Sequence, residues 1–237
     1  MEIMKGKISR SSLPEEPATP HLSRRKFFHF SGIAGVSAIV AGSMTGLAGC
    51  DKDDVNNGIN LGSGDIGVLN YAYALEQLEA AFYTQVIASQ YSGITALETS
   101  YLADIRDHEI AHREFLKAAL KTNAITALEV NFSSIDFSNR SSVLATAKAF
   151  EDLGVSAYNG AGKLLTDGDN LVVAGKIVSV EARHAALIRE LITPNSFSAS
   201  DVVNANGLDM ARTPAEVLSI AATYLKSKLN ASSLPTS

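Results

Sequence analysis

Two short motifs place a carboxylate and an imidazole three residues apart. The first is EIAH, with Glu109 and His112 at its ends, and the second is EARH, with Glu181 and His184. Residues three apart lie on one face of an α-helix, so each pair points in one direction. Carboxylate oxygens and imidazole nitrogens together favour iron or manganese, with zinc possible, over calcium or magnesium. The chemistry that these residue types predict is metal binding.

The motifs stand in the middle of apolar stripes. Around EIAH, Leu102, Ile105 and Leu116 recur at steps of three and four residues, and Glu109 and His112 take the two places between them. Such a stripe is typical of the buried face of an amphipathic helix. A lone Glu/His pair at this spacing is usually a solvated surface pair. The repetition of the pattern in a second helix favours a buried site instead.

Two further glutamates share a pattern of their own. Glu76 is followed seven residues later by Tyr83, and Glu151 seven residues later by Tyr158. The lone glutamates are 75 residues apart and the Glu-x-x-His motifs are 72 apart, which predicts an internal duplication of a helical hairpin. The tyrosines could be core aromatics or could hold a ligand carboxylate by a hydrogen bond, and the two roles are compatible.

Two residues beside these motifs need separate interpretation. Glu79 lies one turn after Glu76 on nearly the same face, whereas its counterpart in the second half is Gly154. Glu79 could be a seventh ligand, a base behind the ligands or a partner in a salt bridge. His108 stands one residue off the apolar stripe, so we expect it to be peripheral.

Four helices must position these residues. Apolar periodicity, the capping-box patterns TALE at residues 95–98 and TPAE at residues 213–216, and the breakers QYSGI and TDGDN indicate the helix boundaries. The expected fold is an all-α four-helix bundle with a long crossover between the second and third helices. The helices are expected over residues 65–89, 95–121, 141–165 and 171–192, with a short fifth helix over 213–228.

Hairpin geometry brings the glutamates of each half to one level. Two residues of an antiparallel hairpin lie level when they are equidistant from its turn. The midpoint between the two glutamates of the first hairpin falls between Ser92 and Gly93, and that of the second falls on Thr166. Both midpoints coincide with turn sequences. Four carboxylates in one core require neutralisation, which two divalent cations would supply.

This pattern resembles the ferritin-like superfamily of dinuclear carboxylate proteins, in which two helices each give one Glu and two each give Glu-x-x-His. The resemblance covers residues 65–193 and implies two iron ions, or two manganese ions, per chain. Carried over residue by residue, it implies Glu109 and Glu181 as bridging ligands, Glu76 and Glu151 as terminal ligands, and His112 and His184 as nitrogen ligands.

The first 50 residues have the pattern of a targeting segment. Arg24 and Arg25 precede an apolar run rich in Gly, Ser and Ala that ends in LAGC at Cys50. This resembles a twin-arginine export signal followed by a lipobox, with Cys50 as the lipid attachment point. An uncleaved membrane anchor is the alternative. Residues 51–64 have little to bury and are expected to form a flexible tether.

Composition excludes several other functions. The chain of 237 residues has a single cysteine, Cys50, so neither a disulfide nor a rubredoxin-type metal site can form within it. From Cys50 onward there are 22 acidic and 14 basic residues, a formal charge of −8. That charge argues against a nucleic-acid partner.

With its export signal, the chain looks most like exported bacterial ferritin-like proteins related to desiccation-associated proteins. The resemblance implies a periplasmic or cell-envelope lipoprotein that reacts with O2 or H2O2, as a ferroxidase or peroxidase, and needs an external electron donor. The alternative is a non-catalytic metal-binding or stress-protective envelope protein. A closed storage cage is disfavoured by the lipid and tether. The C-terminal extension, residues 194–237, could pack on the bundle or form a homodimer contact.

Overall fold

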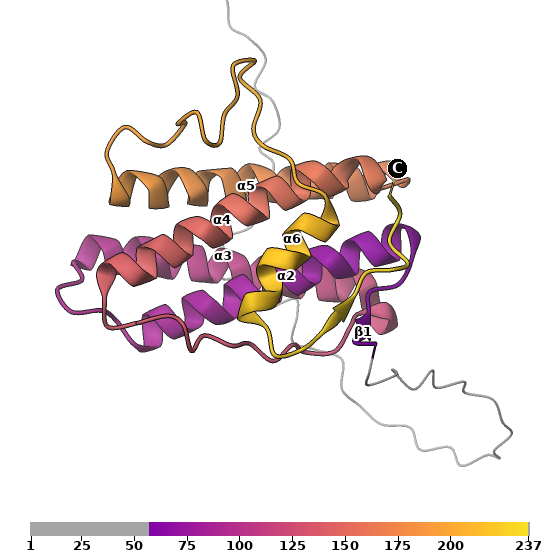
Figure 1. Cartoon of the computed structure of the whole chain (residues 1–237), viewed down its shortest axis with the longest axis horizontal. Helices are drawn as coiled ribbons and strands as arrows, with labels where there is room; N and C mark the ends of the chain where they lie inside the picture. Colours follow the sequence, from indigo (N-terminus) through magenta and orange to yellow (C-terminus); the bar gives the residue numbers. More distant parts are fainter. Residues whose placement is uncertain (1–56, 237) are drawn as a thin grey trace, which may run out of the picture. The chain divides into compact units, whose positions relative to one another are not determined.

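A computed structural model of the chain describes residues 57–236 (Figure 1). Four long helices dominate the fold, as the sequence predicts, and a short helix and a two-stranded ladder accompany them. The long helices are α2 (Gly64–Ala88), α3 (Ala96–Leu120), α4 (Arg140–Ala161) and α5 (Gly168–Ile192). The other elements are β1 (Ile59–Asn60), α6 (Pro214–Ala221), β2 (Leu229–Asn230) and the 3-10 helices η1 (Lys121–Asn123), η2 (Gly162–Leu164) and η3 (Ala222–Tyr224).

Side-chain caps fix where the helices begin. At α3, the Thr95 hydroxyl accepts a hydrogen bond from Glu98 N, and the Glu98 carboxylate accepts one from Thr95 N, which confirms the predicted capping box. The same reciprocal pair, Thr213 and Glu216, starts α6. At α2, by contrast, Ser63 makes no side-chain cap. The observed starts of all five helices lie within three residues of the predicted ones.

The long helices form two hairpins, α2 with α3 and α4 with α5 (Figure 1). The crossover then runs along the bundle from the end of α3 to the start of α4. Its aromatic residues Phe132 and Phe137 pack on Phe82 of α2, with ring centroids 6.0 and 5.9 Å away. The crossover is therefore part of the core. Together with the neighbouring helices it leaves most of α2 buried.

Two helices end earlier than the sequence predicts. α4 passes into η2 after Ala161 and does not continue as an α-helix to residue 165, and α6 passes into η3 after Ala221. Beyond η3, Lys226 N donates a hydrogen bond to the carbonyl oxygen of Glu129 at 2.8 Å. A backbone donor that bonds to the crossover cannot continue the helical ladder, so the fifth helix stops short of residue 228.

The two ends of the described chain pair with each other. β1 and β2 form a parallel ladder in which Ile59 lies opposite Leu229. Leu61, just after β1, is completely buried in the core. β1 and Leu61 belong to the second half of the segment expected to be a flexible tether, residues 51–64. The packed part of the chain therefore begins before α2.

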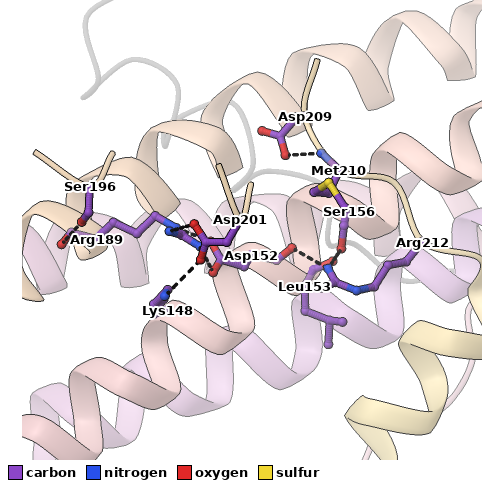
Figure 2. A network of polar contacts seen from close by, with 10 residues as sticks. All are labelled: Lys148, Asp152, Leu153, Ser156, Arg189, Ser196, Asp201, Asp209, Met210 and Arg212. Atoms are coloured by element: carbon purple, nitrogen blue, oxygen red, sulfur yellow. Dashed lines mark hydrogen bonds and ion pairs between the residues drawn. The ribbon is translucent and has the colours of Figure 1, made fainter. Parts of the chain in front are cut away.

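The segment between α5 and α6, residues 193–213, is fastened to the second hairpin (Figure 2). Arg189 of α5 donates hydrogen bonds to Asp152 of α4 at 2.9 and 2.7 Å, and to Asp201 of the segment at 3.0 Å twice. Further along, the backbone N of Arg212 donates to a carbonyl oxygen of α4 at 2.9 Å. Bidentate arginine pairs of this kind fix geometry well. The segment thus braces the two helices that carry half of the candidate ligands.

Arg24, Arg25 and Cys50 lie outside the described residues, and with them the expected export signal and lipid attachment point. Between residues 57 and 236, none of the helices combines the length and apolarity that crossing a membrane requires.

Candidate metal centre

Each of the four long helices contributes to one buried cluster. The Glu-x-x-His motifs lie on α3 and α5, and the lone glutamates lie on α2 and α4. The glutamate side chains are completely buried, whereas His112 and His184 are 13% and 5% exposed. The structure brings together all six residues that the sequence suggested as ligands: Glu76, Glu109, His112, Glu151, Glu181 and His184.

The cluster divides into two groups that share two glutamates. His112 Nδ1 lies 2.8 Å from an oxygen of Glu181 and 3.4 Å from one of Glu76. His184 Nδ1 lies 2.8 Å from an oxygen of Glu109 and 3.5 Å from one of Glu151. The groups are Glu76, Glu109, His112 and Glu181, and Glu109, Glu151, Glu181 and His184. Within each group, one ligand atom per residue lies within 4.8 Å of the others, so Glu109 and Glu181 face both groups.

Within residues 57–236, the atoms that face the cluster contact one another but make no hydrogen bond of good geometry. They are one oxygen each of Glu76 and Glu151, both oxygens of Glu109 and Glu181, and Nδ1 of His112 and His184. A buried polar atom without a partner costs about 1–3 kcal/mol, and more when it is charged. Two ligand atoms that each lie about 2.1 Å from one ion are about 3 Å apart, close to the shortest contacts seen here. Each of the two groups could therefore hold a metal ion.

Each lone glutamate is held by the tyrosine of the other hairpin. The hydroxyl of Tyr83 on α2 donates to Glu151 Oε1 on α4, and the hydroxyl of Tyr158 on α4 donates to Glu76 Oε1 on α2, both at 2.5 Å. These bonds occupy one oxygen of each carboxylate and leave the other facing the cluster. Burial and the neighbouring glutamate raise the pKa of each tyrosine well above its usual range. Both hydroxyls therefore keep their protons.

The crowded carboxylates and imidazoles shift one another's pKa values. Burial raises the pKa of Glu109 well above its ordinary value, and the charge of Glu181 adds to this. Burial also raises the pKa of Glu151, to about 7. Burial alone would lower the pKa of His112 and His184, but the contacts with glutamates raise both to about 12. Metal binding would therefore displace protons from the imidazoles.

A fifth buried carboxylate, Glu79, approaches the cluster from α2. The second half leaves room for it, because a Cβ on Gly154 would lie 3.0 Å from Glu79 Oε1 and 3.7 Å from Glu181 Oε2. Burial, followed by the charges of Glu181 and Glu109, raises the pKa of Glu79 well above its ordinary value. This raised pKa favours the protonated form of Glu79 beside the cluster. Within residues 57–236 no basic side chain pairs with it, so the salt-bridge alternative lacks a partner there.

The expectation that His108 is peripheral is wrong. Its Nδ1 lies 2.9 Å from Nε2 of His184, and the planes of the two imidazoles differ by only 8°. Residue 108 lies beside the buried stripe of α3, and its ring spans the gap to α5 while remaining exposed. One sign of this role is present in the sequence: His108 comes directly before the first motif, whereas the residue directly before the second motif is Val180. The rotation of α3 against α5, which decides the contact, cannot be read from the spacing of either helix alone.

An apolar cavity lies one helical turn from several of the candidate ligands. Its lining includes Ala72, Leu116, Tyr158 and Ile177. Three of these residues lie four positions from a candidate ligand on their own helix, a separation of about 6 Å along the helix axis. Tyr158 contacts both the cavity and the carboxylate of Glu76. A small apolar molecule in the cavity would therefore lie close to the cluster.

Comparison with known proteins bears on the family of this chain. A search of curated proteins found no match. The family model described as a ferritin-like domain matches residues 64–194, from the start of α2 to just beyond α5. These limits enclose both hairpins and all six residues of the cluster. Because the match spans more than half of the chain, the protein belongs to the ferritin-like domain family.

Proposed function

We propose that the chain is an exported dinuclear iron or manganese protein that reacts with O2 or H2O2, in ferroxidase or peroxidase chemistry. The observation that carries this proposal is the pair of ligand groups joined by Glu109 and Glu181. Their inward-facing atoms are buried and make no hydrogen bonds within the described part of the chain. Each group offers three carboxylates and one imidazole, a donor set that suits iron and manganese.

The ligands would divide evenly between the two ions. Glu109 and Glu181 would bridge, Glu76 and His112 would complete one side, and Glu151 and His184 the other. Two ferrous ions bound there would supply two electrons, enough with two protons to reduce one H2O2 to two waters. An external electron donor would restore the electrons, because the chain has only one cysteine and cannot form a rubredoxin-type site.

Residues around the ligands support chemistry rather than simple sequestration. Glu79 is a buried carboxyl group beside Glu181 whose raised pKa favours a bound proton, so it could serve a reaction that consumes protons or become an additional ligand. Tyr83 and Tyr158 restrain the two lone glutamates. The apolar cavity beside Tyr158 favours the approach of a small apolar molecule such as O2.

Export and membrane attachment form a separate part of the proposal. Arg24 and Arg25 would direct the chain through the twin-arginine route, and a lipid on Cys50 would hold it in the periplasm or cell envelope. Replacing both arginines by lysine should block export, whereas Cys50→Ala should release the protein from the membrane fraction. Cell fractionation followed by mass spectrometry of the N-terminal peptide measures both. A homodimer also stays a prediction, which sedimentation of the purified chain tests.

The metal content of the purified full-length chain tests the centre. We expect about two Fe or Mn per chain, and almost none in a Glu109→Ala/Glu181→Ala variant, which loses both shared ligands. Glu114→Ala on the exposed face of α3 is the matched control and should keep both ions. A wild-type protein that stays folded but takes up neither Fe(II) nor Mn(II) would refute the dinuclear centre.

Measurement of catalytic turnover distinguishes the catalytic hypothesis from the non-catalytic one. The loaded protein should consume H2O2 when an electron donor is supplied, or oxidise Fe(II) with O2 or H2O2, through many cycles per centre, and the Glu109→Ala/Glu181→Ala variant should not. Activity no higher than that of free metal would leave a metal-binding or stress-protective envelope protein as the function.

A further inference from the structure

His184 is held from both sides of its ring. Its Nδ1 faces the cluster, 2.8 Å from an oxygen of Glu109. Its Nε2 lies 2.9 Å from Nδ1 of His108, which is exposed on α3. The ring centroids are 5.2 Å apart and the planes differ by 8°, so the rings lie end to end and nearly parallel. This geometry suits a hydrogen bond in the plane of both rings.

The contact determines which nitrogen of His184 is available to an ion. A neutral imidazole has one N–H and one lone pair, and the partner of one nitrogen sets the role of the other. When Nε2 of His184 donates to His108, Nδ1 is left with its lone pair facing Glu109 and Glu151. Partners of this kind fix the tautomer and the ring orientation of a metal ligand.

In the part of the chain that the structure describes, the other half of the cluster has no equivalent contact. The residue one position before the second motif is Val180, which cannot hydrogen-bond through its side chain. Among residues 57–236, no side chain hydrogen-bonds to Nε2 of His112. The two halves therefore present equivalent candidate ligands, but among the described residues only the His184 imidazole is restrained by a second imidazole.

We propose that His108 is a positioning residue for His184, and that it makes the ion held by Glu151 and His184 the more tightly bound of the two. This inference rests on the proposed dinuclear centre and deepens it. His108 does not touch the ions. It acts by holding the His184 ring in the tautomer and the plane that leave Nδ1 free for binding.

Stepwise titration of the metal-free full-length chain with Zn(II), a diamagnetic probe, tests the proposal. His108→Ala should weaken the tighter of the two binding steps by about 10- to 100-fold and leave the weaker step within about twofold. His108→Asn, whose amide oxygen can accept from His184 Nε2, should restore part of the loss. Val180→Ala is the matched control in the other half and should leave both steps unchanged.

NMR of the Zn(II)-loaded protein gives a readout that is independent of affinity. A hydrogen-bonded Nε2–H of His184 should appear as a slowly exchanging imidazole proton that is absent in His108→Ala. Two Zn(II) bound equally well by wild type and His108→Ala, with that proton unchanged, would overturn the role of His108 and leave the dinuclear centre intact. A wild-type chain that binds neither Zn(II), Fe(II) nor Mn(II) would overturn the centre itself.

Discussion

The two hairpins supply the same candidate ligands but surround them differently. Each gives a lone glutamate, a Glu-x-x-His motif and a tyrosine that restrains the glutamate of the other hairpin. The surroundings depart from this repetition at Glu79 and His108, whose counterparts are Gly154 and Val180. The repeated pattern thus builds the set of ligands, and the unequal neighbours distinguish its two sides.

Both unmatched residues belong to the first hairpin but contact the second. Glu79 of α2 occupies space that Gly154 of α4 leaves open, and His108 of α3 bonds to His184 of α5. The group that contains His184 is therefore the more constrained. Two ions bound in such a cluster should differ in affinity even though their ligands match.

Removal of one lone glutamate should have the largest effect on the difference in metal affinity between the two groups. Glu76→Ala and Glu151→Ala should each retain about one ion per chain, because each removes a ligand from only one group. The vacated group should lose more than about 100-fold in affinity, the upper end for residues that only support a ligand. Metal analysis at a fixed free-metal concentration measures this. Loss of both ions in either variant would show that the centre fills as a unit.

Removal of one tyrosine hydroxyl should have the next largest effect. Tyr83→Phe frees Glu151 and Tyr158→Phe frees Glu76, so each should weaken one binding step by about 10- to 100-fold. Each should also lower the free energy of unfolding by about 1 kcal/mol, the net value of a typical hydrogen bond. Chelator competition and denaturant unfolding measure the two quantities. Equal losses would support the symmetry of the tyrosines, and a clear inequality would contradict it.

Substitutions at Glu79 and Gly154 test the second difference between the two hairpins. Glu79→Gln keeps the shape of a protonated carboxyl group, so both ions should remain and the free energy of unfolding should change by less than about 1 kcal/mol. Gly154→Ala brings a Cβ to 3.0 Å from Glu79 Oε1 and should destabilise by about 1–3 kcal/mol.

A double-mutant cycle identifies the cause of the Gly154→Ala effect. Adding Glu79→Ala should relieve the clash, so the two stability effects should be non-additive. Thermal unfolding of the metal-free proteins measures the cycle. Additive effects would mean that Glu79 does not depend on the space beside Gly154. Loss of an ion in Glu79→Gln, measured by metal analysis, would instead indicate that Glu79 is a ligand.

The smallest effects on metal binding should come from the hydrogen bonds and ion pairs of Asp65 and Arg140, which are 75 residues apart and lie outside the cluster. Asp65 accepts hydrogen bonds from Thr166, Asp167 and Asn170 in the α4–α5 turn region. Arg140 instead donates to Glu98 at 2.7 Å. Asp65→Ala should cost about 1–2 kcal/mol, and Arg140→Ala less than about 1 kcal/mol because its ion pair is partly exposed.

The Asp65 effect should depend on pH. Hydrogen bonds from Asn170 and Thr166 lower the pKa of Asp65 below its ordinary value. Its contribution is therefore complete above the unfolded carboxyl pKa of about 3.9 and is lost as the pH falls below that value. Urea unfolding at neutral and acidic pH should show the difference between wild type and Asp65→Ala shrinking in acid. A constant difference would mean that the charge of Asp65 is not involved.

Sequence alone predicted the features that depend on local periodicity. The capping boxes at Thr95 and Thr213, the two hairpin turns and the convergence of glutamates at one level all follow from spacing along a helix. The six clustered residues could be named because the pattern occurs twice. Neither a single Glu-x-x-His motif nor a single tyrosine would have been sufficient.

Features that depend on how elements meet could not be predicted. The contact between His108 and His184 requires the relative rotation of α3 and α5. The space beside Gly154 that Glu79 occupies depends on the distance between α2 and α4. The pairing of β1 with β2 joins segments about 170 residues apart, each too short to give a periodic signal. All three are set by packing between hairpins rather than by propensity within one.

The pairing of β1 with β2 also brings the first and last packed segments of the bundle next to each other. Ile59 N donates to the carbonyl oxygen of Lys228, so the first packed residues lie beside the last ones. In a chain reduced to residues 57–236, a short linker could therefore join residue 236 to residue 57, and new ends could open in the turn between α2 and α3. Such a circular permutant would keep every residue of the cluster in place. The connectivity of the chain would then be separable from the arrangement of its ligands.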